Sequence, residues 1–180
     1  MHTNRYIFIG ALVCASWVSS GCAPVNPLET VPYVEVQQYL GLWYEIARYP
    51  NTFQRQCFGG VTAEYSLRDD GRITVLNKCR EDSLDGPESN IAGVARVVNP
   101  DTNAELKVRF FLFFEGDYFI IDLDDDYQWA VVGEPSRRFL WILSRTPTMD
   151  QAVYQEILSR LPAKNYDPAV LVLTPQPPGM

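Results

Sequence analysis

Histidine is almost absent from this chain of 180 residues, and its one example is His2. If the first residues are removed during export, no imidazole remains to act as a general base. Ser-His-Asp and Cys-His catalytic relays are then excluded, because both depend on a histidine that takes up a proton. Zinc and haem sites that need histidine ligands are excluded as well. We therefore expect no catalytic residue, no metal and no cofactor.

Long hydrophobic runs are also missing. The longest, residues 6–18 after Arg5, is too short to cross a bilayer, which takes about 20 residues, and it is typical of a secretory signal peptide. It leads to Ser19-Ser20-Gly21-Cys22, which resembles the lipoprotein signal whose cysteine thiol is acylated and becomes the new N-terminus. Ala23, rather than Asp, resembles the pattern that sorts such proteins to the outer membrane.

These features predict the organisation of the chain. We expect a signal peptide at 1–21, a lipidated tether at 22–34, one folded domain at 35–175 and a loose tail at 176–180. Acyl chains on Cys22 would hold the protein at the periplasmic face of the cell outer membrane. Because Ser19 stands where that signal usually has Leu, a soluble periplasmic protein remains the alternative.

Positive charge is in short supply, with 15 Lys and Arg against 22 Asp and Glu, a formal net charge of −7. Such a balance is unsuited to nucleic-acid binding. The acidic cluster of Asp122 and residues 124–126 is interpreted as a turn, where Asp side chains accept hydrogen bonds from nearby backbone N–H groups. Its spacing is not that of an EF-hand calcium loop.

Only four cysteines are present, and two of them are expected to be paired. Cys14 leaves with the signal peptide and Cys22 takes the lipid. Asp69-Asp70-Gly71 is a strong hairpin signal, and folding about it brings Cys79 within a few positions of Cys57. In an oxidising compartment a Cys57–Cys79 disulfide should form, with a reactive thiol as the alternative.

Strand-like runs recur between turn signals, enough to close an antiparallel β-barrel around one small ligand. The runs are 41–49, 61–67, 73–79, 91–98, 105–114, 117–123, 128–133 and 139–145. The predicted reversals are Asp69-Asp70-Gly71, Asn99-Pro100-Asp101, Glu115-Gly116-Asp117 and Glu134-Pro135-Ser136.

One helix is predicted after the strands, over residues 149–161. Thr148 and Gln151 fit a capping box, and Pro162 ends the helix. Its apolar stripe is expected to pack against the outside of the barrel.

Three stretches of the chain resemble, in order, the motifs of the lipocalin family. They are Gly41-Leu42-Trp43, then Asp124-Asp125-Asp126-Tyr127 before a strand, and finally the strand that ends at Arg145. The sequence around them is most similar to bacterial outer-membrane lipoprotein lipocalins and to apolipoprotein D. The resemblance implies an eight-stranded up-and-down barrel with one C-terminal helix outside. It also implies that the Arg145 guanidinium packs over Trp43 at the closed end.

Alternation along the first strand places Glu45 and Ala47 on the inward face of Trp43. A buried carboxylate must be paired or protonated. We expect Glu45 to meet Arg96 or Arg109, or to give the pocket a polar floor. An outward Glu45, displaced by a bulge, is the alternative.

The same alternation, together with the resemblance, predicts the residues that line a ligand. They are Glu45, Tyr65, Val75, Phe111, Phe113, Tyr118 and Trp141. The implied function is a carrier of fatty acids or lysophospholipids, without enzymatic activity. The alternatives are an isomerase-type enzyme that uses a cavity thiol and a dimeric interaction scaffold. The aromatic run 110–114 is expected to lie at the mouth, where it contacts a membrane or a second subunit, or is covered.

Overall fold

A computed structural model of the chain describes residues 26–111 and 114–177. The predicted signal peptide and Cys22 lie outside the described residues. The elements are α1 (Val36–Tyr39), β1 (Gly41–Arg48), β2 (Cys57–Leu67), β3 (Ile73–Glu81), β4 (Glu88–Val97), β5 (Glu105–Phe111), β6 (Phe114–Leu123), β7 (Trp129–Gly133), β8 (Leu140–Ser144), α2 (Gln151–Arg160), the 3-10 helices η1 (Leu161–Lys164) and η2 (Pro168–Val170), and β9 (Val172–Leu173).

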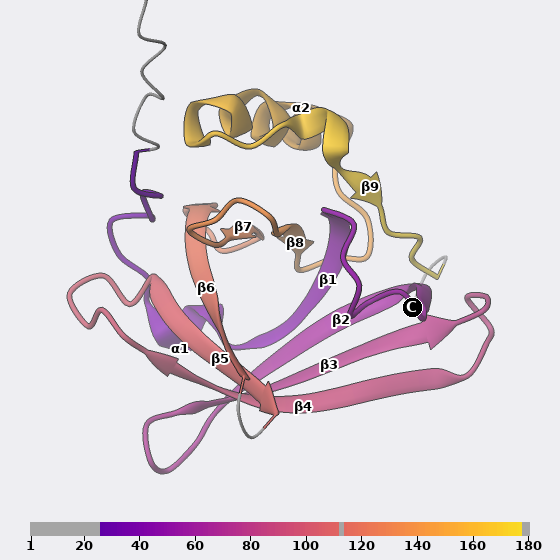
Figure 1. Ribbon diagram of the computed structural model, residues 1–180, viewed down its shortest axis with the longest axis horizontal. Coiled ribbons are helices and arrows are strands. Elements are labelled where there is room, and N and C mark those ends of the chain that lie inside the picture. Colours follow the sequence, from indigo (N-terminus) through magenta and orange to yellow (C-terminus); the bar gives the residue numbers. More distant parts are fainter. Residues whose placement is uncertain (1–25, 112–113, 178–180) are drawn as a thin grey trace, which may run out of the picture.

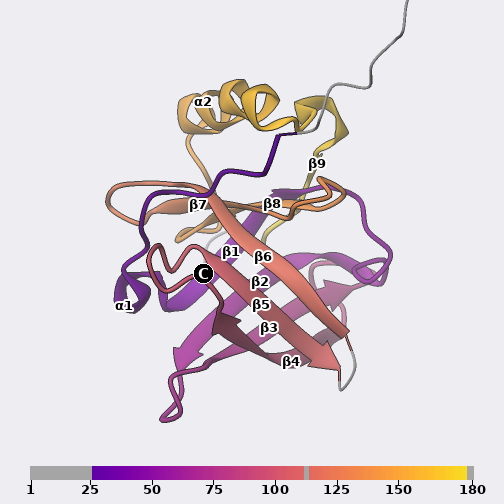
Figure 2. The same ribbon diagram turned by 60° about the vertical axis from the view of Figure 1, so that its left-hand side comes forward.

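The strands form one antiparallel sheet that closes into a barrel (Figure 1). Each strand from β2 to β8 pairs with the next, β8 pairs with β1, and β1 closes the ring by pairing with β2. The short β9 adds to β1. Helix α2 lies outside, across β7 and β8 (Figures 1 and 2). The predicted eight-stranded barrel with one external C-terminal helix is confirmed.

The hairpin between β5 and β6 differs from the prediction. Glu115, Gly116 and Asp117 are strand residues that pair with Arg109, Val108 and Lys107. The reversal therefore lies between Phe111 and Phe114, which also pair with each other. The glycine signal was misleading because a glycine also fits within a strand, where it leaves space on one face.

The helix α2 also starts later than predicted. Its N-cap is Asp150, whose carboxylate accepts hydrogen bonds from the backbone N–H groups of Ala152 and Val153. The predicted cap at Thr148 is therefore wrong. Asp and Thr both cap helices well, and the sequence offered both within three positions.

Two hydrophobic clusters organise the molecule. The first fills the barrel and includes Trp43, which is fully buried, with partly buried Trp141 packed against it. The second lies between the outer face of the barrel and α2, where Ile142 packs with Ile157. Alternate residues of β8 thus serve opposite sides, Leu143 inside and Ile142 outside.

The segment before α1 is packed on the barrel rather than loose. Leu28 joins the cluster beneath α2, and Val34 is 1% exposed inside the closed end. Between them, Val31 N–H donates to the Ile120 carbonyl at 3.0 Å. Figure 2 shows this segment (indigo) passing beneath α2 before it reaches α1. The segment expected to be a tether thus contributes to the folded domain from Leu28 onward.

The C-terminal segment fills the gap where β1 and β2 separate. Thr174 N–H donates to the Ile46 carbonyl at 2.9 Å, and Gly60 N–H donates to the Pro175 carbonyl at 2.8 Å. The Gln176 side chain bridges the two strands, donating to the carbonyls of Glu45 and Val61. The tail expected from residue 176 is therefore held at its first position.

The predicted disulfide between Cys57 and Cys79 is present, with 5.5 Å between the Cα atoms. It joins the start of β2 to the end of β3, where the register between these strands shifts. Among the described residues, no helix has the length and apolar character needed to span a membrane.

Candidate functional site

The barrel is closed at one end by Trp43 and Arg145. The Arg145 Cζ lies 3.8 Å from the centre of the Trp43 ring. Its two Nη atoms donate to the carbonyls of Leu42 and Gln38, and Trp43 Nε1 donates to the Tyr39 carbonyl at 2.8 Å. Guanidinium and indole are thus fixed by backbone acceptors, as the lipocalin resemblance implied. This contact forms the plug of the barrel.

Gly41 is required at the start of β1. Its φ of +92° lies in the region that favours glycine, and a Cβ there would lie 3.5 Å from Arg145 Nη1. The glycine lets the chain turn from α1 into β1 directly beneath the guanidinium.

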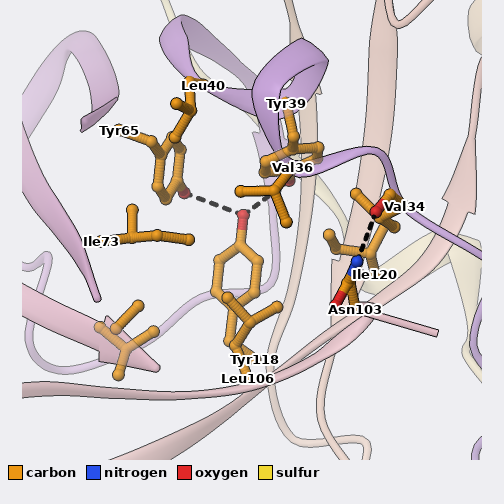
Figure 3. A pocket seen from close by; sticks show the side chains of 12 residues that line it. Val34, Val36, Tyr39, Leu40, Tyr65, Ile73, Asn103, Leu106, Tyr118 and Ile120 are labelled. Atoms are coloured by element: carbon orange, nitrogen blue, oxygen red, sulfur yellow. Dashed lines mark hydrogen bonds between the residues drawn. The ribbon is translucent and has the colours of Figure 1, made fainter. Parts of the chain in front are cut away.

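Above the plug, three tyrosines share hydrogen bonds inside the barrel (Figure 3). The Tyr118 hydroxyl lies 2.7 Å from that of Tyr39 and 2.8 Å from that of Tyr65. Burial raises the pKa of Tyr65 to about 12, although its hydrogen bond to Tyr118 opposes the shift. Burial likewise raises the pKa values of Tyr39 and Tyr118, so all three are neutral at physiological pH.

The space around these tyrosines is small. The cavity among α1, β3, β5 and β6 has a volume of about 20 Å³, and apolar side chains form nearly all of its wall. Ile73, Leu106 and Ile120 are among them (Figure 3). A volume of this size accommodates about one water molecule. An acyl chain therefore cannot occupy the closed end without displacing side chains.

The open end is covered by aromatic side chains and the loop between β1 and β2. Trp141 stacks on Phe139 with 6.0 Å between ring centres, and Phe53 from the loop meets both rings. Gln54 of the same loop accepts a hydrogen bond from Trp141 Nε1 at 3.1 Å. The loop is thus joined to the inward face of β8.

Glu45 is the charged centre of this region and is only 3% exposed. It accepts hydrogen bonds from Thr174 Oγ1 at 2.5 Å and from Gln54 Nε2 at 2.8 Å. Desolvation raises the pKa of Glu45, while these two bonds and the charge of Arg48 oppose the shift. One carboxylate therefore holds both the mouth loop and the C-terminal segment.

The cation beside Glu45 was wrongly predicted. Arg48 Nε lies 3.6 Å from Glu45 Oε1, whereas Arg96 is paired with Glu115 on the outside. The cause is a bulge between Glu45 and Ala47, after which Arg48 stands opposite Trp141. Ala47, predicted to face inward, belongs instead to the cluster beneath α2.

Three buried polar atoms have no hydrogen-bond partner among the described residues. They are Arg48 Nε, Asn77 Oδ1 and Gln176 Oε1. Asn77 shares the inward face of β3 with Val75, which is 2% exposed. Because an unpaired buried polar atom is costly, Asn77 Oδ1 is suited to a polar group of a ligand or to water.

A larger hollow, of about 380 Å³, lies on the outside of the barrel. Its wall includes Thr74, Val94 and Arg109, which alternate with the inward residues of β3, β4 and β5. Arg109, a predicted partner of Glu45, is therefore on the opposite side of the wall. The described residues contain no cluster of acidic, cysteine or histidine side chains able to hold a metal.

The predicted lining residues fall into two groups. Tyr65 and Tyr118 meet near the closed end, whereas Glu45 and Trp141 are joined through Gln54 near the mouth. Val75 lies within the same interior cluster. Phe113 and the side chain of Phe111 lie outside the described residues.

Four participants were missed: Tyr39, Arg48, Gln54 and Thr174. Tyr39 lies in a short helix and Gln54 in a loop, where strand alternation gives no signal. Arg48 was hidden by the bulge. Thr174 lies more than a hundred positions from Glu45, and only the folded chain brings them together.

Comparisons with known proteins agree with this geometry. A family model described as a lipocalin-like domain matches residues 34–176. The chain is 39% identical to the outer membrane lipoprotein Blc of Escherichia coli (strain K12) over 176 residues, which is 96% of this chain and 98% of that protein. It is 38% identical to temperature-induced lipocalin-1 of Arabidopsis thaliana over 157 residues, 83% of each chain.

A solved structure shows the same fold at lower identity. Insecticyanin from the tobacco hornworm Manduca sexta superimposes with a TM-score of 0.67 at 16% identity, covering 85% of this chain and 86% of that one. The closed barrel, the Trp43–Arg145 plug and the match over residues 34–176 together identify the chain as a member of the lipocalin family.

Proposed function

We propose that this lipocalin is a non-enzymatic carrier of single-chain lipids, such as fatty acids or lysophospholipids, held at the outer membrane. The observation that supports it most is the inward face of the barrel. Apolar and aromatic side chains fill it, three tyrosine hydroxyls near the closed end bond to one another, and a carboxylate, Glu45, lies near the mouth. A ligand with an apolar tail and one polar end matches this distribution.

Entry would take place at the open end, because the Trp43–Arg145 contact closes the other end. The loop bearing Phe53 and Gln54 would have to move, and the acyl chain would replace the contacts of Trp141 with these residues. Each buried methylene contributes about 0.8 kcal/mol, so twelve give roughly 10 kcal/mol before the costs of ordering. Micromolar affinity needs about 8 kcal/mol, which leaves little to spare for moving the loop.

The lining proposed for the tail is Val75 and Trp141, with Tyr65 and Tyr118 reached only where side chains at the closed end move aside. Phe111 and Phe113 are proposed as lining residues as well. Glu45 lies beside the polar end of the ligand. The isomerase alternative needs a thiol, and both cysteines of the described chain are joined in the disulfide. No specific contact in the described chain favours that alternative.

Anchoring is part of the proposal. We propose that Cys22 carries the acyl chains and that the protein faces the periplasm, which is supported by likeness to an outer membrane lipoprotein over nearly the whole chain. Labelling with radioactive palmitate should mark the wild type and not Cys22→Ala, and the variant should leave the membrane fraction. A labelled Cys22→Ala protein would contradict the assignment.

The carrier function is tested by native mass spectrometry of the chain without its signal peptide and lipid. A lysophospholipid and a long-chain fatty acid are added separately. We expect one lipid per chain, weakened in Trp141→Ala. The matched control is Trp129→Ala, because this tryptophan packs beneath α2 outside the barrel.

Each outcome separates two explanations. Loss of lipid in Trp141→Ala but not in Trp129→Ala supports binding inside the barrel. Equal affinity in wild type and Trp141→Ala would remove Trp141 from the pocket. No adduct with either lipid would mean that the barrel is filled by its own side chains, and a dimeric interaction scaffold would become the better proposal.

A further inference from the structure

Aromatic and arginine side chains gather on one side of the open end. Phe53 is 54% exposed, and its ring centre lies 5.3 Å from that of Phe139. The exposed Arg138 places its Cζ 5.6 Å from the centre of the Phe139 ring. Arg55, also exposed, follows on the loop that carries Phe53. We call these four residues the basic-aromatic rim: Phe53, Arg55, Arg138 and Phe139.

The N-terminal part of the chain arrives at the same place. Arg137, next to Arg138, donates from Nη2 to the carbonyl of Asn26 at 2.6 Å. Asn26 is the first described residue, only four positions after Cys22. Four residues span at most about 14 Å when fully extended. A lipid on Cys22 would therefore hold the bilayer close to this rim and far from the plug.

We propose that the basic-aromatic rim docks on an anionic bilayer surface, so that the open end of the barrel faces the membrane. Guanidinium groups are weakly hydrated and bind phosphate through paired N–H donors. An exposed phenylalanine side chain gains by burying its apolar surface at the boundary between headgroups and acyl chains. The rim presents both on adjacent loops, between β1 and β2 and between β7 and β8.

The charge distribution sets the direction of docking. The chain carries a formal net charge of −7, so an anionic surface repels most of it. The loop between β3 and β4, at the same end, exposes Asp82 and Asp85. The barrel should therefore tilt, with the β1–β2 and β7–β8 loops toward the bilayer. This surface acts on the outside and does not depend on a lipid inside the barrel.

The test measures how the chain without its signal peptide and lipid, with Cys22→Ser, binds to vesicles. Sedimentation is compared on phosphatidylethanolamine–phosphatidylglycerol vesicles (3:1) and on phosphatidylcholine vesicles. Each arginine near an anionic surface changes the affinity by about fivefold, so Arg55→Gln with Arg138→Gln should lower it by roughly 25-fold. Phe53→Ser should lower it on the same vesicles. The matched control is Arg68→Gln with Arg72→Gln, two solvent-accessible arginines beside Asp70 at the closed end.

The proposal requires that the rim variants lose vesicle binding while the control pair stays within about twofold of the wild type. Similar thermal unfolding midpoints will show that the variants are folded. An equal loss in the control pair would mean that charge alone acts, and would overturn the proposal. So would the absence of wild-type binding to the anionic vesicles. A rim variant that dissociates a dimer in analytical ultracentrifugation, with vesicle binding unchanged, would assign the rim to a second copy instead.

Discussion

Glu45→Gln tests the reasoning about the buried carboxylate most directly. The wild-type side chain accepts from Thr174 Oγ1 and Gln54 Nε2. A glutamine keeps an acceptor for Gln54, and the Thr174 hydroxyl can turn to accept from the new amide. At low pH, where Glu45 is protonated, we expect the two free energies of unfolding to agree within about 1 kcal/mol. Glu45→Ala removes both bonds, each worth about 1.5 to 3 kcal/mol with a charged partner, and should cost about 3 to 6 kcal/mol.

The pH dependence has a definite sign. Burial raises the pKa of Glu45, so between the ordinary value and the raised one the folded state binds more protons than the unfolded state. The wild-type free energy of unfolding therefore falls as pH rises through that window, by about 1.4 kcal/mol for each unit of upward shift. Glu45→Gln lacks this titration. The free energy of unfolding of the variant should therefore rise relative to that of the wild type from pH 4.5 upward, and the difference should stay constant above the raised pKa.

Urea unfolding followed by tryptophan fluorescence at several pH values between 4 and 8 measures the difference. Subtracting the variant's free energy of unfolding from that of the wild type at each pH cancels the contribution of all other titrating groups. Glu64→Gln, on the outer face of β2, controls for the loss of a negative charge. A difference that stays flat across this range, or that grows in favour of the wild type, would refute the assignment of Glu45 as a carboxyl destabilised by burial.

Three further predictions concern stability. Trp43→Ala should cost about 3 to 5 kcal/mol in denaturant unfolding, because it empties the closed end and removes the ring beneath a guanidinium; a cost under 1 kcal/mol would contradict its role as the plug. Tyr166→Phe should cost about 1 to 3 kcal/mol, since the hydroxyl pairs with both the N–H and the carbonyl of Glu134, and unchanged stability would show that water replaces it. Replacing both Cys57 and Cys79 by alanine opens a loop with a sequence separation of 22 and should lower the free energy of unfolding by about 3 kcal/mol relative to the oxidised wild type. If reductant lowers the free energy of unfolding of the double variant by the same amount, the disulfide is not the cause.

Much of the fold was readable from local patterns. Alternation along β3 and β8 placed Val75 and Trp141 inward, because a regular strand turns successive side chains to opposite faces. The hairpin signal at Asp69-Asp70-Gly71 fixed the pairing of β2 with β3, and that pairing brought Cys57 to Cys79.

The candidate site was readable only in part. Local alternation fails at a bulge, and the one between Glu45 and Ala47 moved Arg48 to the inner face. The predicted reversal at Glu115-Gly116-Asp117 was wrong because strand pairing outweighs the turn preference of a single glycine.

The family, the strand order and the residues that plug the barrel follow from the sequence, since they depend on short-range periodicity and motifs. The surroundings of Glu45 depend instead on how the whole chain folds. Its partners Gln54 and Thr174 come from a loop and from the C-terminal segment, which have no periodic pattern and meet only when the barrel closes. The small cavity beside the three tyrosines likewise depends on which side chains meet across the barrel, and local patterns do not specify this packing.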